Sequence, residues 1–502
     1  MGVTDIAPQQ SNSASATPRP FRFNLFVPIL IACALLLFAQ NLTSYFLADD
    51  FVLLSWTRSH SLSAIPSFFD PNTFWFYRPI VKLVYWAGQG LFGMRAAPFH
   101  ILSLALHGVN AYLLYRLVAY HLGGGWVTGL AASLIFLTIP HHAESVSWIA
   151  VIGDLIATCC LLCALLLYSR YADGGKTVYL LGLLGFFAVA LLSRETSVML
   201  LPLLVLASLI LRLDARLPMR RRALVFVACI GLVLAYLLVQ VLGRAQGQES
   251  LARGGLQFRA LNPDSILLAI LEYMHGLLPG GLLARLPVEA LRVIVWPEWL
   301  LILLLAYLLW RTGRRLALFG LAWMLITPLV FIFFSPPADR YYYLPSIGFA
   351  IAAASLLTDL ARLTTSRRFP TSSRWAGVAA GLLVAVLVLW QSAQLYANEQ
   401  GWRAAGIASG GLIHDTRQAV QDPRDYTAFY YVGLPETVRG VPLFGGMIKD
   451  VIQLIYDNDT LSAFSVNCDY LRKQTELPRY NFLFHFKPDG AEPFATAGDC
   501  RD

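Results

Sequence analysis

The chain has 502 residues, of which 57% are hydrophobic and 14% are charged, and its mean hydropathy is +0.59. This composition excludes a soluble globular protein of this length and indicates a polytopic helical membrane protein. The formal net charge of +8 would fit a nucleic-acid-binding protein, but the arginines fall mostly in short clusters between apolar segments, as in the cytoplasmic loops of membrane proteins.

The first 22 residues are rich in Ser, Ala, Pro and Gln. A segment of this composition cannot bury a core, so we predict a disordered cytoplasmic tail. It is too polar to be the start of a cleaved signal peptide. The apolar segment that follows should therefore stay in the membrane.

Apolar segments long enough to cross a bilayer recur along the chain. We place spans at residues 24–46, 97–120, 126–140, 145–170, 177–193, 197–213, 223–243, 294–310, 316–335, 345–363 and 375–395. The result is a domain of about eleven transmembrane helices over residues 23–395. With an odd number of spans, the two termini should lie on opposite sides of the membrane.

The basic clusters set the orientation. Arginines gather at residues 212–222, 311–315 and 362–374, and the positive-inside rule makes all three clusters cytoplasmic. The clusters agree with one another only if residues 265–280 do not cross the membrane. This segment is short and ends in a Pro-Gly-Gly sequence, so we predict a re-entrant or interfacial helix there.

This orientation places the loops 47–96 and 244–293 and the tail from residue 396 outside the cytoplasm. Residues 396–502 are more polar and contain alternating apolar runs, so we predict a small extracytoplasmic α/β domain. Cys468 and Cys500 are the two cysteines in polar sequence. They could form a disulfide, because the predicted topology puts them in an oxidising compartment.

Two adjacent carboxylates, Asp49 and Asp50, follow the first apolar segment. Ionisable groups are tolerated at the end of a span, but one acid would serve a structural role and two neighbouring acids repel each other. We therefore predict that this pair is the chemical centre of the protein. The simpler alternative is a solvated helix end at the membrane interface.

Further polar side chains gather at the span ends on the same predicted side. They are Arg78, Lys82, His141, His142, Glu144, Asp154, Arg194, Glu195, Asp339, Arg340 and Tyr343. Histidines and tyrosines are common at membrane interfaces, and Arg194 and Glu195 could form a local ion pair. Asp154 lies deeper, where a carboxylate must face a cavity or a partner. Together these residues predict a polar cavity that opens to the outer side.

A metal site is a weaker hypothesis. His141, His142 and Glu144 are suitable ligand types, but three ligands within four residues and no partner elsewhere form a weak pattern. We predict no cofactor and no bound metal, with a divalent ion as the less favoured alternative.

The predicted extracytoplasmic location also limits which donors a transferase could use. Nucleotide-activated substrates are scarce outside the cytoplasm, so a transferase there usually uses a lipid-linked donor. Transfer of a sugar from a polyprenyl monophosphate needs a carboxylate that takes the proton of the acceptor hydroxyl and cations that neutralise the departing phosphate. Asp49 or Asp50 could supply the base, with Asp49 preferred. Arg78, Lys82 and Arg340 could supply the positive charge, with Arg194 or His142 as further candidates.

The order of these elements resembles the GT-C superfamily of membrane glycosyltransferases, especially protein O-mannosyltransferases and the membrane part of mannosyltransferases that carry tetratricopeptide repeats. The resemblance covers roughly residues 24–360. Its elements are Asp49-Asp50, Tyr77-Arg78-Pro79, Pro98-Phe99-His100 with His107 and Asn110, His141 to Glu144 with Trp148 and Asp154, Leu192 to Glu195, Tyr273 with Leu278-Pro279, and Asp339 to Ser346.

The resemblance implies a catalytic acid in the first outer loop, a polyprenyl-phosphate sugar as donor and inverting transfer. Mannose is then a candidate sugar, and the acceptor is a hydroxyl on a protein or a glycan. Two positions depart from the pattern. Ile152 stands where the repeat-bearing relatives have an Arg, and Arg194 stands where they have a Lys. No tetratricopeptide repeats follow the last predicted span, so the acceptor stays open.

Two alternatives also stay open. A glycan polymerase or ligase with a lipid-diphosphate donor would rely on a large outer loop rich in Arg and His, and residues 244–293 contain few of these. A non-enzymatic lipid or solute transporter would commonly show two related halves, and the sequence shows no such repetition.

Overall fold

The structure is a computed structural model that describes residues 26–74, 76–244, 263–277, 288–331, 338–363, 370–473, 480–496 and 499–500. The predicted tail, residues 1–22, lies outside the described residues. So do residues 245–262 and 278–287 of the predicted loop 244–293.

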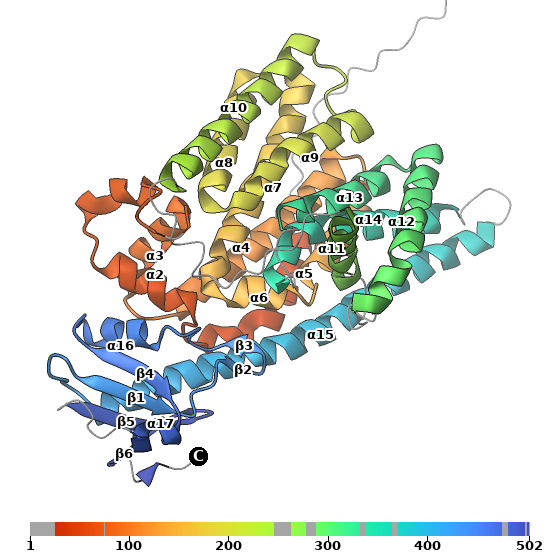
Figure 1. The fold of residues 1–502 in the computed structure, drawn as a ribbon. Coiled ribbons are helices and arrows are strands. Elements are labelled where there is room, and N and C mark those ends of the chain that lie inside the picture. The colour runs from red at the N-terminus through yellow and green to blue at the C-terminus, as the bar shows by residue number, and fades with distance from the viewer. Residues whose placement is uncertain are drawn as a thin grey trace, which may run out of the picture.

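Helices form most of the described chain (Figure 1). They are α1 (Phe26–Leu35), α2 (Asp49–Arg58), α3 (Pro79–Phe92), α4 (Ala97–Arg116), α5 (Gly125–Leu137), α6 (His142–Ser147), α7 (Ile152–Gly174), α8 (Thr177–Ser193), α9 (Leu200–Leu206), α10 (Met219–Arg244), α11 (Pro263–Leu277), α12 (Val288–Arg311), α13 (Arg315–Ile326), α14 (Tyr343–Leu363) and α15 (Pro370–Ala419). Short 3₁₀ helices, Leu36–Thr43 and Asp339–Tyr342, continue α1 and precede α14.

Within the described residues, five helical segments are long and apolar enough to cross a membrane. They are Ala97–His121, Ile149–Gly174, Met219–Gly243, Asp339–Leu360 and Gly377–Ala419. Shorter apolar helices are Gly125–Leu137, Thr177–Ser193, Glu195–Leu211, Ile266–Leu277 and Arg315–Val330. The chain is therefore a helical integral membrane protein, as predicted from composition, while the number of eleven spans stays a prediction.

The outside of the helical region carries apolar side chains. Leu234 in α10, Leu300 in α12 and Leu389 in α15 are all exposed. Large side chains of this kind on the surface of several helices fit contact with lipid tails and would be costly in water.

Small residues allow α13 and α14 to pack at close range. A Cβ atom on Gly320 would lie 2.7 Å from the carbonyl oxygen of Gly348 and 2.6 Å from the backbone nitrogen of Ala352. Close approach of backbones at glycine is a common way for membrane helices to associate, because lipid offers no hydrophobic driving force between them. This contact fixes α14, which begins next to Arg340.

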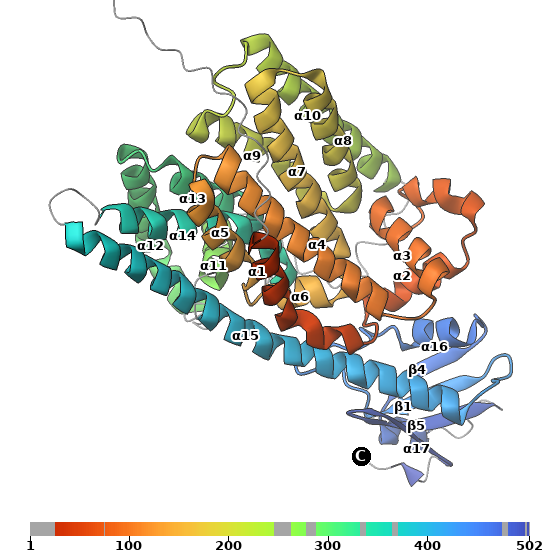
Figure 2. The ribbon, with the colours of Figure 1, turned by 180° about the vertical axis from the view of Figure 1, so that it is seen from behind.

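Helix α15 continues to Ala419, beyond residue 395, where the sequence analysis ends the last span. Figure 2 shows this helix running along one side of the bundle and into the C-terminal sheet. The helix continues because residues 396–419 keep an apolar face, including Leu412 and Ile413, that is buried against the rest of the protein.

The C-terminal unit that follows α15 contains a four-stranded sheet with the order β4-β1-β5-β6. Its elements are β1 (Ala428–Val432), β2 (Thr437–Val438), β3 (Val441–Pro442), α16 (Ile448–Tyr456), β4 (Ser462–Val466), α17 (Cys468–Lys473), β5 (Asn481–Lys487) and β6 (Gly490–Phe494). Strand β1 pairs in parallel with β4 and β5, and all five of its residues are buried, as expected for a central strand covered on both faces. Cys468 and Cys500 are joined by a disulfide. Helix α16 contacts both β4 and α2, so it lies between the sheet and the membrane-embedded part (Figure 1).

We expect Gly320→Ala to lower the thermal unfolding temperature, because the added methyl group meets the backbone of α14 and overpacking of this kind costs about 1–3 kcal/mol. Gly381→Ala in α15 is the matched control, because no other atom lies within 4 Å of its Cβ position. Equal unfolding temperatures for the two purified variants would contradict this view of the α13–α14 contact.

Candidate active site

The two adjacent acids lie in the first turn of α2, which begins at Asp49. The partial positive charge at a helix N-terminus favours carboxylates at this position. The preceding residue, Ala48, has φ 42° and ψ −116°, and its N–H donates to the carbonyl oxygen of Leu443 at 2.9 Å. The chain therefore turns sharply between the first apolar segment and the helix that carries the acids.

Asp50 is buried and hydrogen-bonded. Its carboxylate accepts from the Tyr85 hydroxyl at 2.6 Å and from the Leu47 backbone N–H at 2.9 Å. Burial raises the pKa of Asp50 to about 7, against the lowering effect of these two hydrogen bonds. Asp50 therefore ties α2 to α3 and has little access to a substrate.

Asp49 differs from its neighbour in being only partly buried. Among the residues that the structure describes, none donates a hydrogen bond to its carboxylate or forms an ion pair with it. Burial raises the pKa of Asp49, while the positive charges of Arg340 and Arg78 act in the opposite direction. Within the described part of the chain, Asp49 is thus a carboxylate without a hydrogen-bond or ion-pair partner, and Arg340 and Arg78 are the cations whose charges act on it.

The arginines at this end of the bundle are held by carboxylates. Arg78 forms a bidentate pair with Glu195, from Nε to Oε2 at 3.0 Å and from Nη2 to Oε1 at 2.6 Å. Arg194 lies with Nε 3.0 Å from Oδ1 of Asp154. Bidentate arginine–carboxylate contacts fix the plane of the guanidinium, so its remaining N–H groups point in defined directions.

Arg340 is held in the same way from a different part of the chain. Its backbone N–H donates to Oε2 of Glu144 at 3.0 Å, and its guanidinium pairs with the same carboxylate. The guanidinium also lies over the rings of Trp148, at 5.4 Å, and Tyr341, at 4.8 Å. Trp148 in turn donates from Nε1 to the carbonyl oxygen of Leu47 at 3.3 Å, two residues before Asp49.

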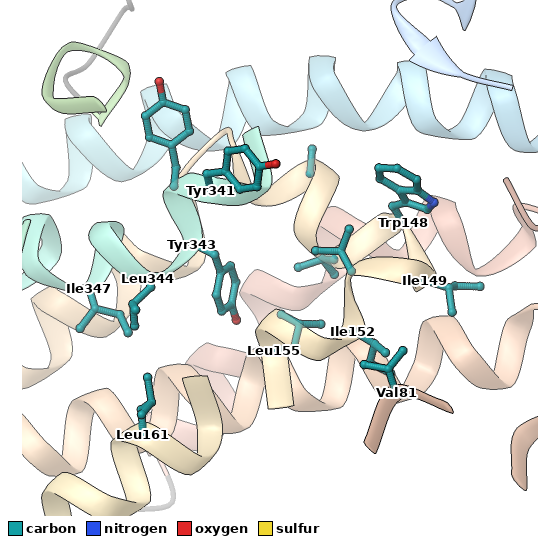
Figure 3. Packing of buried hydrophobic residues seen from close by; sticks show 14 of the residues in the cluster. Val81, Trp148, Ile149, Ile152, Leu155, Leu161, Tyr341, Tyr343, Leu344 and Ile347 are labelled. Carbon is teal, nitrogen blue, oxygen red and sulfur yellow. The ribbon is translucent and has the colours of Figure 1, made fainter. Parts of the chain in front are cut away.

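A close contact between α3, α7 and the end of α8 brings these groups together. A Cβ on Gly153 would lie 2.7 Å from the carbonyl oxygen of Ser193 and 2.9 Å from Cγ2 of Val81. The neighbours of these residues in the sequence are Asp154 and Arg194. Figure 3 shows the apolar cluster beneath the site, with Val81 beside Ile152.

His141 and Asp339 form a second pair near Arg340. Nδ1 of His141 lies 2.7 Å from Oδ1 of Asp339, and Nε2 lies 2.7 Å from the carbonyl oxygen of Gly276. The ring stacks on Tyr342 with 4.2 Å between centroids. This pair joins the start of α6 to the segment that carries Arg340.

His142 and Tyr343 lie in a buried polar layer between the helices. Nε2 of His142 contacts the Ser346 hydroxyl at 2.9 Å, and the Tyr343 hydroxyl contacts Nδ1 of His107 at 2.9 Å and Nδ2 of Asn110 at 3.1 Å. Both side chains are buried, and these polar groups are engaged with helix neighbours. These contacts are with neighbouring helices, and the predicted role of the two side chains at the donor stays a prediction.

Lys82 lies one helical turn after Arg78 in α3, and its side-chain nitrogen contacts the segment before that helix. Its ammonium is fully buried, donates to the Thr73 hydroxyl at 3.0 Å, and lies 4.7 Å from the ring centroid of Trp56 and 5.6 Å from that of Phe74. Burial lowers the pKa of Lys82 to about 8, against the charge of Asp70. Lys82 thus anchors the segment between α2 and α3, and its predicted role at the donor phosphate stays a prediction.

The sequence predicts Tyr85 as part of the aromatic belt of an interfacial helix and does not indicate its hydrogen bond to Asp50. One signal was available, because a buried acid needs a donor and Tyr85 lies in the same predicted outer loop. Within the described ranges, no three His, Cys, Asp or Glu side chains are grouped as a metal ion would require.

Comparisons with known proteins come from a family model and from solved structures. Residues 77–239 match the family described as dolichyl-phosphate-mannose-protein mannosyltransferase. No curated protein matches the chain. The chain is similar to the crystal structure of ArnT from Cupriavidus metallidurans bound to undecaprenyl phosphate, with 14% identity and a TM-score of 0.50 over 92% of this chain and 93% of that chain. The same protein in the apo state gives 14% identity and a TM-score of 0.49 over 92% of each chain.

The resemblance to the GT-C superfamily that the sequence indicates is confirmed by these two kinds of comparison. The matched family segment includes Arg78, Glu144, Asp154, Arg194 and Glu195, and thus most of the charged groups described above.

We expect Tyr85→Phe to lower the thermal unfolding temperature. The substitution leaves the buried Asp50 without its side-chain donor, and a buried group that loses a partner typically costs about 1–3 kcal/mol. Tyr426→Phe is the matched control, because Tyr426 is exposed. Two variants that unfold at the same temperature would show that Asp50 does not depend on this hydrogen bond.

Proposed function

We propose that this chain is a GT-C membrane glycosyltransferase that transfers a sugar from a polyprenyl-phosphate donor to a hydroxyl acceptor on the extracytoplasmic face, with inversion and with Asp49 as general base. The observation that carries the proposal is the unpartnered carboxylate of Asp49 opposite Arg340 and Arg78. The GT-C resemblance supports a lipid-linked donor, and the ArnT crystal structure with undecaprenyl phosphate supports a polyprenyl phosphate as its lipid part.

The chemistry is a single displacement at the anomeric carbon of the sugar. The acceptor hydroxyl approaches Asp49, and its oxygen forms a bond to that carbon while its proton passes to the carboxylate. The bond from the anomeric carbon to the phosphate oxygen breaks at the same time. Its electron pair leaves with the polyprenyl phosphate.

The departing phosphate gains negative charge, which needs stabilisation by preorganised donors. Arg78 and Arg340 are positioned by Glu195 and Glu144 before any donor binds, so little reorganisation is needed. The guanidinium of Arg78 uses Nε and Nη2 on its acid, which leaves Nη1 for a phosphate oxygen. Arg194 beside Asp154 extends the same basic surface.

The basic clusters support an extracytoplasmic site. Helix α7 has 23 residues and is about 35 Å long, which is enough to cross a hydrocarbon core of about 30 Å. Asp154 lies in its first turn, whereas Gly175, just after its end, accepts a hydrogen bond from Arg221 at 3.5 Å. The basic segment around Arg221 and the candidate site therefore lie at opposite ends of a membrane-spanning helix. By the positive-inside rule, the site faces away from the cytoplasm.

Mannose is the first donor sugar to test, because the matched family model is described by dolichyl-phosphate-mannose. The acceptor would be a hydroxyl of a protein or a glycan. The alternative of a lipid-diphosphate polymerase or ligase depends on residues 244–293, most of which lie outside the described residues.

We expect Asp49→Asn to lower transfer from polyprenyl-phosphate mannose by about 10²–10⁴-fold, the usual contribution of a general base, with an unchanged unfolding temperature. Release of polyprenyl phosphate in the presence of membrane extract as acceptor source measures the reaction. Asp50→Asn should reduce the unfolding temperature more than Asp49→Asn, because Asp50 is the buried member. Asp173→Asn, at the far end of α7, is the control. Full activity of Asp49→Asn would refute the assignment of the base.

The pH dependence follows from the environment of Asp49. A base works only when deprotonated, so kcat/KM should rise with pH through the pKa of Asp49, which burial places above its ordinary value of 3.8. Arg340→Gln removes a positive charge that lowers this pKa, so the acidic limb of the residual activity should move to higher pH. A limb that stays in place, or moves to lower pH, would contradict the proposed pairing of Asp49 and Arg340.

A further inference from the structure

The turn before the catalytic helix has a backbone conformation that a non-glycine residue rarely adopts. Ala48 has φ 42° and ψ −116° and is buried. Such conformations cost about 1–3 kcal/mol and persist only where the surroundings hold them. The N–H of Ala48 donates to the carbonyl oxygen of Leu443, which belongs to the C-terminal unit. This unit therefore provides a contact that holds the residue directly before Asp49.

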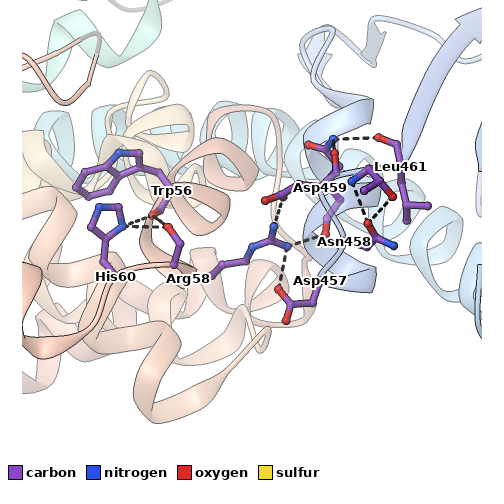
Figure 4. A network of polar contacts seen from close by, with 10 residues as sticks. Trp56, Arg58, His60, Asp457, Asn458, Asp459 and Leu461 are labelled. Carbon is purple, nitrogen blue, oxygen red and sulfur yellow. Dashed lines mark hydrogen bonds and ion pairs between the residues drawn. The ribbon is translucent and has the colours of Figure 1, made fainter. Parts of the chain in front are cut away.

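The other end of α2 is also held by the C-terminal unit (Figure 4). Nη1 of Arg58 donates to the carbonyl oxygen of Gln453 at 2.6 Å and lies 3.3 Å from Oδ1 of Asp457, and Nη2 pairs with Asp459. The Arg58 side chain is 15% exposed, whereas those of Asp457 and Asp459 are 87% and 81% exposed. Exposed acids contribute little, but the Gln453 carbonyl lies in the last turn of α16, where the helix carries partial negative charge.

Apolar contacts connect these two ends. The ring of Phe51 lies 5.7 Å from that of Phe444 between centroids. Val451 and Ile452 of α16 are fully buried in the same core as Phe51. Helix α2 thus rests on residues 443–459 along its whole length.

The segment before Ala48 rests on the extended part of α15. The Ser409 hydroxyl donates to the carbonyl oxygen of Phe46 at 2.7 Å. A Cβ on Gly406 would lie 2.6 Å from Cβ of Ser44, so only a residue without a side chain allows this approach. Residues C-terminal to 395 therefore contact the chain both before and after the acid pair.

We propose that the C-terminal unit holds α2, the helix that carries Asp49, in position. We further propose that Arg58 is a positioning residue of the active site. Helix α2 has 10 residues, fewer than the ~12–15 that an isolated helix needs for even marginal stability. Its position must therefore come from its contacts. The proposal rests on the proposed role of Asp49, because a base that moves by about 1 Å loses up to ~100-fold in rate.

The test compares Arg58→Gln and Arg58→Lys with Arg424→Gln in the full-length protein. Arg424 donates to the Tyr480 hydroxyl at 2.8 Å within the C-terminal unit and makes the matched control. Arg58→Gln should lower kcat by ~10–100-fold and leave KM for polyprenyl-phosphate mannose nearly unchanged, because it displaces the base and not the donor site. Arg58→Lys should recover part of kcat, and Arg424→Gln should change neither constant.

Hydrogen exchange provides a readout that does not depend on activity. Backbone amides of residues 48–58 should exchange faster in Arg58→Gln and unchanged in Arg424→Gln. The double variant Asp457→Asn with Asp459→Asn changes only exposed residues. It should lower kcat and speed exchange of residues 48–58, both by less than Arg58→Gln does. This variant keeps the proposal testable if Arg58→Gln does not fold.

Three outcomes would overturn the proposal that the C-terminal unit positions α2. They are normal exchange and kcat in Arg58→Gln, an equal loss in Arg424→Gln, or a rise in KM with constant kcat. Faster exchange in Arg58→Gln, together with no sugar transfer by the wild-type protein, would support the positioning of α2 by the C-terminal unit and refute the proposed function.

Discussion

The arrangement of this site depends on one constraint, which is that a charge removed from water must be paired. Three arginines at one end of the bundle meet this requirement with three acids from other elements, in the pairs Arg78–Glu195, Arg194–Asp154 and Arg340–Glu144. These pairs connect α3, α6, α7 and the segments before α9 and α14. Arg194 and Asp154 are both buried, so breaking their pair would leave an uncompensated charge, and the three pairs together hold these elements against one another. Among the residues that the structure describes, Asp49 is the acid of this group that no arginine pairs with, which is why we propose it as the base.

Sequence reasoning located the acids and arginines because charged residues stand out at the ends of apolar segments. It could not divide the work between Asp49 and Asp50, since the difference comes from Tyr85, 35 residues away in the chain. It grouped Lys82 with the phosphate-binding cations and did not foresee that its ammonium lies over the rings of Trp56 and Phe74. Residue type and spacing do not indicate which basic side chain is covered by neighbouring residues and which stays open to a substrate.

The end of the last long helix was harder to predict for a related reason. Hydropathy falls after residue 395, so the last span was predicted to end there, but helix formation does not depend on hydropathy alone. Glycine and serine at positions 406 and 409 allow residues 44–46 to lie on the helix, and this contact stabilises it as far as Ala419. A run of mostly small residues at positions 404–411 is present in the sequence, but the segment that packs on it lies more than 350 residues away in the chain.

The uninterrupted course of α15 has a consequence for how this protein can be divided. A fragment that starts at residue 396 would begin in the middle of a helix and would uncover the face on which residues 44–46 rest. Such a fragment would expose Leu412 and Trp402 to water and would be prone to self-association. The C-terminal part is therefore not an interchangeable module, and a chimaera with a relative would have to exchange α2 and α16 together.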